Sequence, residues 1–138
     1  MVRRLHCCTA GCVTALLGVV LSTASWATLS QGEGSRGEAA TFESRCAACH
    51  SVNANRIGPM LAGVVGRKVA SVPGYPYSDA IKHLKGTWDR GRLEAWLSNP
   101  QAVAPGTKMA FALTDAEERR QVIRFLGSGA ARLQDGKE

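Results

Sequence analysis

The chain has 138 residues, of which 45% are hydrophobic, enough apolar material for the core of one small domain. Its formal net charge is +6. The basic residues are scattered among acidic ones, and neither a basic run nor an aromatic stacking motif is present in the sequence. Nucleic acid is therefore not expected as a partner.

Residues 1–27 have the layout of a secretory signal peptide. Arg3 and Arg4 precede an apolar run from Gly11 to Leu21, and small residues follow up to Ala27. The run is about half of the ~20 residues that a membrane span needs. We predict cleavage near Ala27, export to the periplasm and no stable membrane insertion afterwards. An uncleaved anchor is the alternative.

Cleavage would leave two of the five cysteines, because Cys7, Cys8 and Cys12 lie in the predicted signal. Cys46 and Cys49 remain. Fifteen basic and eleven acidic residues follow the signal, a net charge of +4. We expect most of these charges to lie on a solvated surface. The functional alternative is a ring of Lys and Arg that steers an acidic protein partner.

The first half of the remaining chain combines one helix with long loops. Residues 28–37 are rich in Gly and Ser and are predicted to form a flexible linker. A helical pattern runs from Glu38 to Cys49. Residues 51–77 contain four glycines and three prolines, so we expect mostly loop there, with a helical turn at 60–65.

The second half contains three further helix predictions. Short helices are expected at 78–84 and 89–97, the second ended by Asn99-Pro100. The clearest helix follows Thr114, which forms a capping-box pattern with Glu117, and it ends at Leu126 before Gly127. A domain over 38–127 with a C-terminal tail over 128–138 follows from this pattern.

The fold class is therefore all-α, with four to five short helices. No convincing alternating strand pattern occurs in the sequence. The loops are long for such a small domain, which indicates that something other than a polypeptide core organises them.

The motif Cys46-Ala-Ala-Cys49-His50 identifies that organiser as a haem. Two thiols three residues apart can add to the two haem vinyl groups, and the following imidazole can then bind the iron. A thioredoxin-like pair would need a βαβ setting, and a zinc site would need another pair of ligands at short spacing. Neither is present in the sequence, so we predict one covalently attached haem c.

The second axial position on the iron has several candidates. Met60 follows His50 so closely that it would have to fold straight back across the haem, and a packing role suits it better. His83 lies between lysines, as surface histidines often do. Met109 follows a Pro105-Gly106 turn in a loop that could wrap to the other face of the haem. An empty axial position is the remaining possibility.

Five stretches together resemble class I cytochromes c, the mitochondrial type and its soluble bacterial relatives. They are FESRCAACH, GPMLAGVVGRK, PGYPYSDAIK, TWDRGRLEAWLSNP and PGTKMAF, in that order, between about Glu38 and Leu126. The resemblance implies a small helical fold around one haem, with His50 as proximal ligand and Met109 as distal ligand.

The resemblance also implies roles for further residues. Phe42 and Phe125 would pack where the first and last helices cross, and the Pro59 carbonyl would orient the His50 imidazole. The remaining implied roles are propionate donors at Arg67, Tyr77 and Trp88, an aromatic beside the distal methionine at Phe111, and a hydroxyl near its sulfur at Thr107.

Two departures from the family pattern concern the interior and the surface. Ile81 and Met60 stand where the mitochondrial proteins carry asparagines, which puts the internal polar network in doubt. The lysine-rich surface is thinned to Lys68, Lys82, Lys85 and Lys108. A partner that matches the mitochondrial surface should therefore not be assumed.

The predicted function is that of a periplasmic, monomeric carrier of one electron, not an enzyme. Iron with two axial ligands has no open position for a substrate, and an acidic partner would dock briefly at the basic rim. Two alternatives remain open. One is a dedicated electron-accepting subunit of an oxidoreductase complex. The other is a peroxidase or gas-binding protein in which Met109 does not bind the iron.

Overall fold

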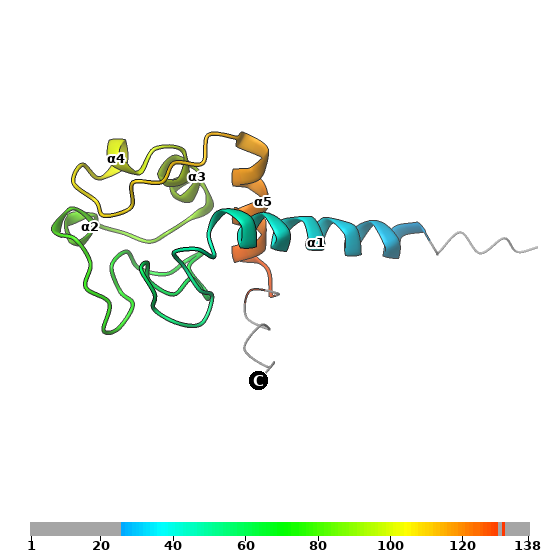
Figure 1. Cartoon of the computed structure of the whole chain (residues 1–138), viewed down its shortest axis with the longest axis horizontal. Helices are drawn as coiled ribbons and strands as arrows, with labels where there is room; N and C mark the ends of the chain where they lie inside the picture. The colour runs from blue at the N-terminus through cyan, green and yellow to red at the C-terminus, as the bar shows by residue number, and fades with distance from the viewer. Residues whose placement is uncertain (1–25, 130, 132–138) are drawn as a thin grey trace, which may run out of the picture.

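A computed structural model describes residues 26–129 and residue 131 (Figure 1). The predicted signal peptide lies almost wholly outside these residues. The described chain contains five helices and one isolated β-bridge, between Lys68 and Thr87, which confirms the predicted all-α class. The helices are α1 (Trp26–Arg45), α2 (Asp79–His83), α3 (Arg90–Ser98), α4 (Pro100–Val103) and α5 (Ala116–Gly127).

The crossing of α1 and α5 is the main helix contact (Figure 1). The rings of Phe42 and Phe125 meet there with their centroids 4.8 Å apart, as predicted, and both residues are at most 2% exposed. Val122, Ile123, Phe125 and Leu126 form one buried face of α5. Burial of such a side chain contributes about 1.5–3 kcal/mol, so this face stabilises the whole fold.

Polar pairs surround the crossing. Arg45 donates to Glu118 at 2.6 Å, and Thr41 Oγ1 donates to Gln121 Oε1 at 2.5 Å. Exposed ion pairs add little stability because water screens them. These contacts therefore fix how α1 and α5 are aligned more than they hold the helices together.

The backbone of residues 28–37 is helical in α1, not the flexible linker predicted for it. The prediction relied on three glycines and low apolar content. Once the turns of α1 beside α5 are formed, however, extending the helix costs little, because propagation is far easier than nucleation. In Figure 1 the N-terminal half of α1 projects away from the other helices.

The starts of α3 and α5 are set by side-chain caps. Asp89 Oδ1 accepts from Arg92 N at 2.8 Å at the start of α3, near the predicted position. At α5 the predicted Thr114 cap is wrong. Asp115 Oδ1 accepts from Glu118 N at 2.8 Å instead, so the cap lies one residue later, and the Glu118 carboxylate pairs with Arg45.

Arg119 connects α5 to α3 and to the segment before α5. Its Nε donates to Glu94 Oε1 at 2.6 Å, and its Nη1 donates to the carbonyls of Leu113 and Thr114, both at 2.8 Å. These carbonyls lie outside any helix and need a donor. The guanidinium therefore fixes the chain at Leu113 and Thr114, just before α5.

The loops between α1 and α3 are held by turns and side chains. The predicted helical turn at 60–65 is a tight turn instead, with Val64 N bonded to Leu61 O at 3.0 Å. Asn55 Nδ2 donates to Pro73 O at 3.3 Å, and Asn55 Oδ1 accepts from Met60 N at 3.0 Å. One amide thus joins three parts of the loop region.

The short helices fall close to their predicted ranges, except for α4. Ser78 and Leu84 flank α2, and α3 ends before Asn99-Pro100 as predicted. Pro100 then begins α4, because Asn99 Oδ1 caps a new turn by accepting from Ala102 N at 3.0 Å. Within residues 26–129, no helix has both the length and the apolar character needed to span a bilayer.

Ala70 offers a test of backbone strain, because it is a non-glycine residue with a φ of 55°. That left-handed conformation costs an L-residue roughly 1–2 kcal/mol, while glycine adopts it freely. We expect Ala70→Gly to raise the free energy of unfolding by roughly 0.5–1 kcal/mol in denaturant titrations.

The control is Ala40→Gly, at an exposed position inside α1. It should lower the free energy of unfolding by roughly 0.5–1 kcal/mol, because glycine is a poor helix former. Destabilisation by both substitutions would show that the Ala70 backbone is not strained.

Candidate functional site

The predicted attachment cysteines lie on a turn that continues directly from α1. Cys46 N donates to Phe42 O at 2.8 Å, and both Cys49 N and His50 N donate to Cys46 O, at 3.0 and 2.8 Å. Both thiols are free in the described chain. The backbone therefore holds two thiols and an imidazole on a single turn, the arrangement the motif predicted.

The two thiols differ in their surroundings. Cys46 is half-buried against the hydrophobic core, whereas Cys49 is exposed. Burial, aided by the neighbouring Cys49, raises the pKa of the Cys46 thiol to about 11. Before haem attachment Cys46 is therefore a protonated thiol at neutral pH. It can add to an unsaturated carbon, but it is a weaker nucleophile than a thiolate.

The His50 imidazole is fixed by the loop that follows it. Its Nδ1 lies 2.9 Å from the carbonyl oxygen of Pro59, which can only accept, so we assign the proton to Nδ1. Burial lowers the pKa of His50. A neutral ring with Nδ1 engaged leaves the Nε2 lone pair for a metal, the state that an iron ligand requires.

Gly58 allows this loop to lie directly against the imidazole. A Cβ atom at Gly58 would stand 2.2 Å from His50 Cε1 and 2.5 Å from Nδ1, far too close for any side chain. Gly58 N also donates to Cys49 O at 2.8 Å, which ties the loop back to the attachment turn. Glycine is thus required here by close approach, not by backbone conformation.

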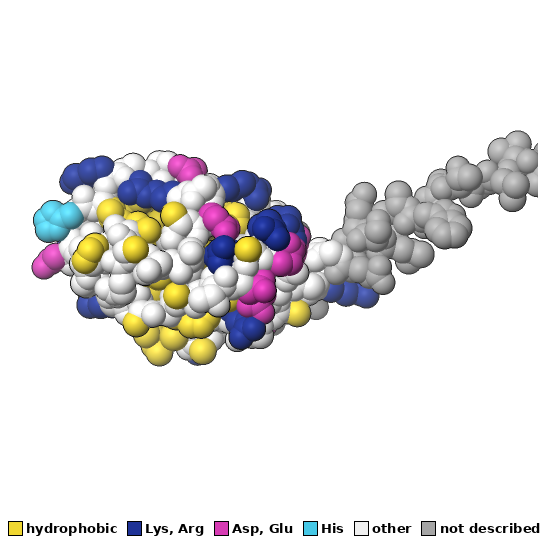
Figure 2. Space-filling model, turned by 90° about the horizontal axis from the view of Figure 1, so that it is seen from above, with side chains coloured by type: hydrophobic (Ala, Val, Ile, Leu, Met, Phe, Trp, Pro, Cys, Tyr) yellow, Lys and Arg dark blue, Asp and Glu magenta, His cyan; other side chains and the backbone are white. Residues whose placement is uncertain are grey.

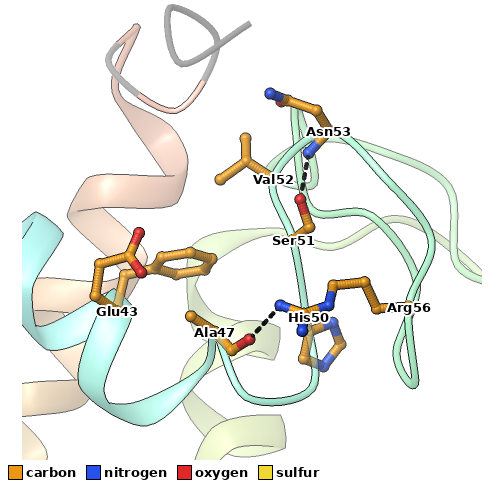
Figure 3. Close-up of a pocket in the computed structure, with 8 residues that line it drawn as sticks. Glu43, Ala47, His50, Ser51, Val52, Asn53 and Arg56 are labelled. Atoms are coloured by element: carbon orange, nitrogen blue, oxygen red, sulfur yellow. Dashed lines mark hydrogen bonds between the residues drawn. The ribbon is translucent and has the colours of Figure 1, made fainter. Parts of the chain in front are cut away.

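A small pocket opens beside His50, on the side of the attachment turn (Figure 3). Arg56 reaches across it and donates from Nη1 to Ala47 O at 2.7 Å. This bond fastens the exposed part of the loop to Ala47, one of the two residues between the cysteines. The other lining residues are Phe42, Glu43, Ser51, Val52 and Asn53.

The structure describes the surroundings of two candidates for the second axial position, Met109 and His83. Met109 is half-buried and packs against the hydrophobic core. The tight turn before it contains Gly106, with a φ of 86°, and Thr107 N donates to Ala104 O at 3.0 Å. His83 lies exposed on α2 with its Nδ1 2.7 Å from Asp79 O, a local contact typical of a surface histidine.

Several residues with implied secondary roles have other partners in the described chain. Arg67 donates to the carbonyls of Met60 and Ala62, at 2.8 and 2.9 Å, and so fixes the loop after Pro59. Trp88 is buried and packs against Trp96, with ring centroids 5.3 Å apart. Contacts of Arg67, Tyr77 and Trp88 with haem propionates stay predictions, as do the positions of Phe111 and Thr107 relative to the distal sulfur.

Sequence reasoning missed Ser78. Its hydroxyl is buried and has no hydrogen-bond partner within the described chain. Serine before a helix normally caps it, but the Ser78 side chain makes no cap bond to α2. No sequence signal distinguishes such a serine from an ordinary cap. A buried hydroxyl without a partner costs free energy, so it suits contact with a polar atom of a bound group.

These features fit a haem. The chain offers two thiols for covalent attachment, a neutral imidazole with one free nitrogen, a half-buried thioether and an unpaired buried hydroxyl. Within residues 26–129, no three His, Cys, Asp or Glu side chains are arranged so that they could together hold a metal ion. Such a site defines a c-type haem protein.

Comparison with known proteins gives the family. The family model described as Cytochrome c matches residues 35–130, and the chain belongs to the cytochrome c family. Cytochrome c of Cochliobolus lunatus is 45% identical over 100 residues, which are 70% of this chain and 92% of that protein. Cytochrome c2 of Rhodomicrobium vannielii is 44% identical over 88 residues, 61% of this chain and 70% of that protein.

The likeness extends to a solved structure. Cytochrome cH from Methylobacterium extorquens matches with a TM-score of 0.64 and 38% identity, over 67% of this chain and 96% of that chain. The predictions of a class I, mono-haem cytochrome c, of its fold and of covalently bound haem c are therefore confirmed, and Cys46 and Cys49 fit the attachment motif. The chain is an electron-transfer haem protein.

The close contact at Gly58 gives a test of the His50 position. Gly58→Ala would force the loop away from the imidazole, because the new Cβ would overlap the ring. We expect the holoprotein to lose roughly 1–3 kcal/mol of unfolding free energy, as other overpacked interiors do, and its haem absorption spectrum to change.

Gly37→Ala serves as the control, since a Cβ at Gly37 in α1 meets nothing within 4 Å. It should leave the spectrum unchanged and keep or slightly raise stability. If Gly58→Ala behaved in the same way, the Gly58 backbone could not lie against His50.

Proposed function

We propose that this cytochrome c carries single electrons outside the cytoplasm, with His50 and Met109 as the axial ligands of one haem attached through Cys46 and Cys49. The observation that carries the proposal is the bond between His50 Nδ1 and Pro59 O, at 2.9 Å. It leaves Nε2 as the one ring nitrogen available to iron and fixes the plane of the imidazole.

Met109 is favoured as the distal ligand by its surroundings. Its side chain packs against the hydrophobic core, and the turn before it directs the loop. The other candidates are less suited, because Met60 is not among the half-buried hydrophobic residues that pack against the core of the described chain, and His83 is exposed on α2. A thioether is a soft ligand that stabilises ferrous iron and raises the reduction potential.

The polypeptide would keep water away from the site. Bound haem supplies an iron that gains and loses one electron. The interior contains buried apolar side chains from α2 and α3, namely Ile81, Leu93, Trp96 and Leu97. With both axial positions occupied and little water to reorganise, transfer of an electron needs no rearrangement and no substrate binding.

Location in the periplasm is supported by the signal-like residues 1–27 and by the covalent attachment of haem. Most of that segment lies outside the described residues. If this segment is retained as an anchor, the protein would instead serve as an electron-accepting subunit of an oxidoreductase complex at a membrane. The N-terminal sequence of the purified protein distinguishes the two.

The partners are proposed to be redox proteins with acidic docking faces, met by a monomer. The residues after Ala27 carry a net charge of +4. Figure 2 shows Lys and Arg spread over one face with acidic groups among them, not gathered in one patch. Such a distribution favours weak, short-lived encounters over a tight complex.

Replacement of the proposed distal ligand is the central test. In the holoprotein, Met109→Ala should remove the red absorption band of methionine-ligated ferric haem and allow carbon monoxide to bind the ferrous form. The reduction potential should fall by at least about 0.1 V, because axial ligands set haem potentials over a range of about 0.8 V.

Met60→Ala is the matched control and should change neither the band nor the potential by much. An unchanged spectrum in Met109→Ala would overturn the ligand assignment. A red band lost only in Met60→Ala would transfer the assignment to Met60.

Charge steering gives a second test. The rate of reaction of the ferrous holoprotein with hexacyanoferrate(III), an anion, should fall as ionic strength rises, because salt screens the attraction to a positive protein. Stopped-flow measurements over a salt series check this. A rate that rises with salt would show that the surface around the haem edge is not positive.

A further inference from the structure

The side chain of Gln101 contacts the loop of Met109 at three points. Gln101 is the second residue of α4. Its Nε2 donates to Thr107 O at 2.9 Å and, more weakly, to Met109 O at 3.4 Å, while its Oε1 accepts from Gly106 N at 3.1 Å. One planar amide thus spans most of the loop between α4 and Met109.

The chemistry of these contacts requires an amide. The tight turn bonds Thr107 N to Ala104 O, which leaves the Gly106 N–H without a partner inside the turn. Gln101 supplies an acceptor for that N–H and donors for two carbonyls. Lysine would offer only donors and glutamate only acceptors, so neither can reproduce the set.

The position of Gln101 is fixed by α4. Pro100, its neighbour, is among the most deeply buried side chains. Asn99 caps the helix through Ala102 N at 3.0 Å, and Ala104 N closes it onto Pro100 O at 2.9 Å. The amide is therefore placed by α4 and does not depend on the loop that it contacts.

The main chain around Met109 has little other support. Among the described residues, the backbone groups of 108–112 form no backbone-to-backbone hydrogen bond, and the next such bond is Leu113 N to Leu97 O at 2.8 Å. Lys108 Nζ donates to Pro76 O at 3.1 Å, but through a long, exposed side chain. Gln101 is thus the polar contact nearest to Met109.

We propose that Gln101 is a positioning residue, which holds the 104–109 loop so that the Met109 sulfur stays on the iron and thereby sets how readily another ligand replaces it. The proposal rests on Met109 being the distal ligand. Gln101 is exposed to solvent on its outer side, so water competes with its bonds. Its loss should speed ligand exchange without abolishing methionine binding.

The test follows imidazole binding to the ferric holoprotein, which displaces the methionine and bleaches the red absorption band. We expect Gln101→Ala to bind imidazole about tenfold faster than the unsubstituted protein, a change of about 1.4 kcal/mol. Gln101→Glu should also bind imidazole faster than the unsubstituted protein, because it keeps the acceptor for Gly106 N but loses both donor contacts.

Gln121→Ala is the matched control. Gln121 is also a glutamine with a bonded amide, but its partner is Thr41 at the α1–α5 crossing. Gln121→Ala should lower the free energy of unfolding in denaturant titrations about as much as Gln101→Ala does. It should leave the rate of imidazole binding within about twofold of that of the unsubstituted protein.

The outcomes distinguish the two proposals. If Met109→Ala keeps the red band, the ligand assignment fails, and the Gln101 proposal fails with it. If Met109→Ala loses the band while Gln101→Ala exchanges at the unsubstituted rate, or no faster than Gln121→Ala, the ligand assignment stands and the Gln101 proposal alone is overturned.

Discussion

The packing of Phe42 against Phe125 is the contact on which the rest of this cytochrome depends. The Phe42 ring fixes α1 across α5, and the Phe42 carbonyl accepts the first hydrogen bond of the turn that begins at Cys46. Helix packing and haem attachment therefore share one residue. A shift of α1 along α5 would move the thiols and the imidazole with it, since no flexible joint separates them.

The backbone carbonyls of the loops accept many of their hydrogen bonds from side chains. Side chains, not ladders, supply the donors: Arg67 serves the carbonyls after Pro59, and Arg119 serves those before α5. This solves the problem of unpaired backbone groups but provides little apolar burial. A haem has a large apolar surface. Its covalent attachment therefore gives the loops apolar surface to pack against.

Much of this could be predicted from the sequence, for reasons that the structure makes clear. The attachment motif is local chemistry, and α5 has both an apolar face and a capping pattern, so position errors such as Thr114 for Asp115 are small. The helical start of α1 was missed because glycine content says little about a helix extended from packed turns. Ser78 and Gln101 were also missed, since the burial of the Ser78 hydroxyl and the contacts of Gln101 exist only once the loops are folded.

The joint made by Asn55 has a consequence for acid tolerance. This amide links the chain at Met60 and Pro73, and an amide neither gains nor loses a proton over the pH range in which proteins fold. Acid acts instead on carboxylates such as Glu117, whose pKa is lowered by hydrogen bonds from Arg120 and Arg124, so that Glu117 stays ionised to a lower pH than an ordinary glutamate. Their contribution is present above the ordinary carboxyl pKa and disappears as pH falls through the lowered one. Acid that neutralises these exposed carboxylates therefore leaves the Asn55 joint between Met60 and Pro73 intact.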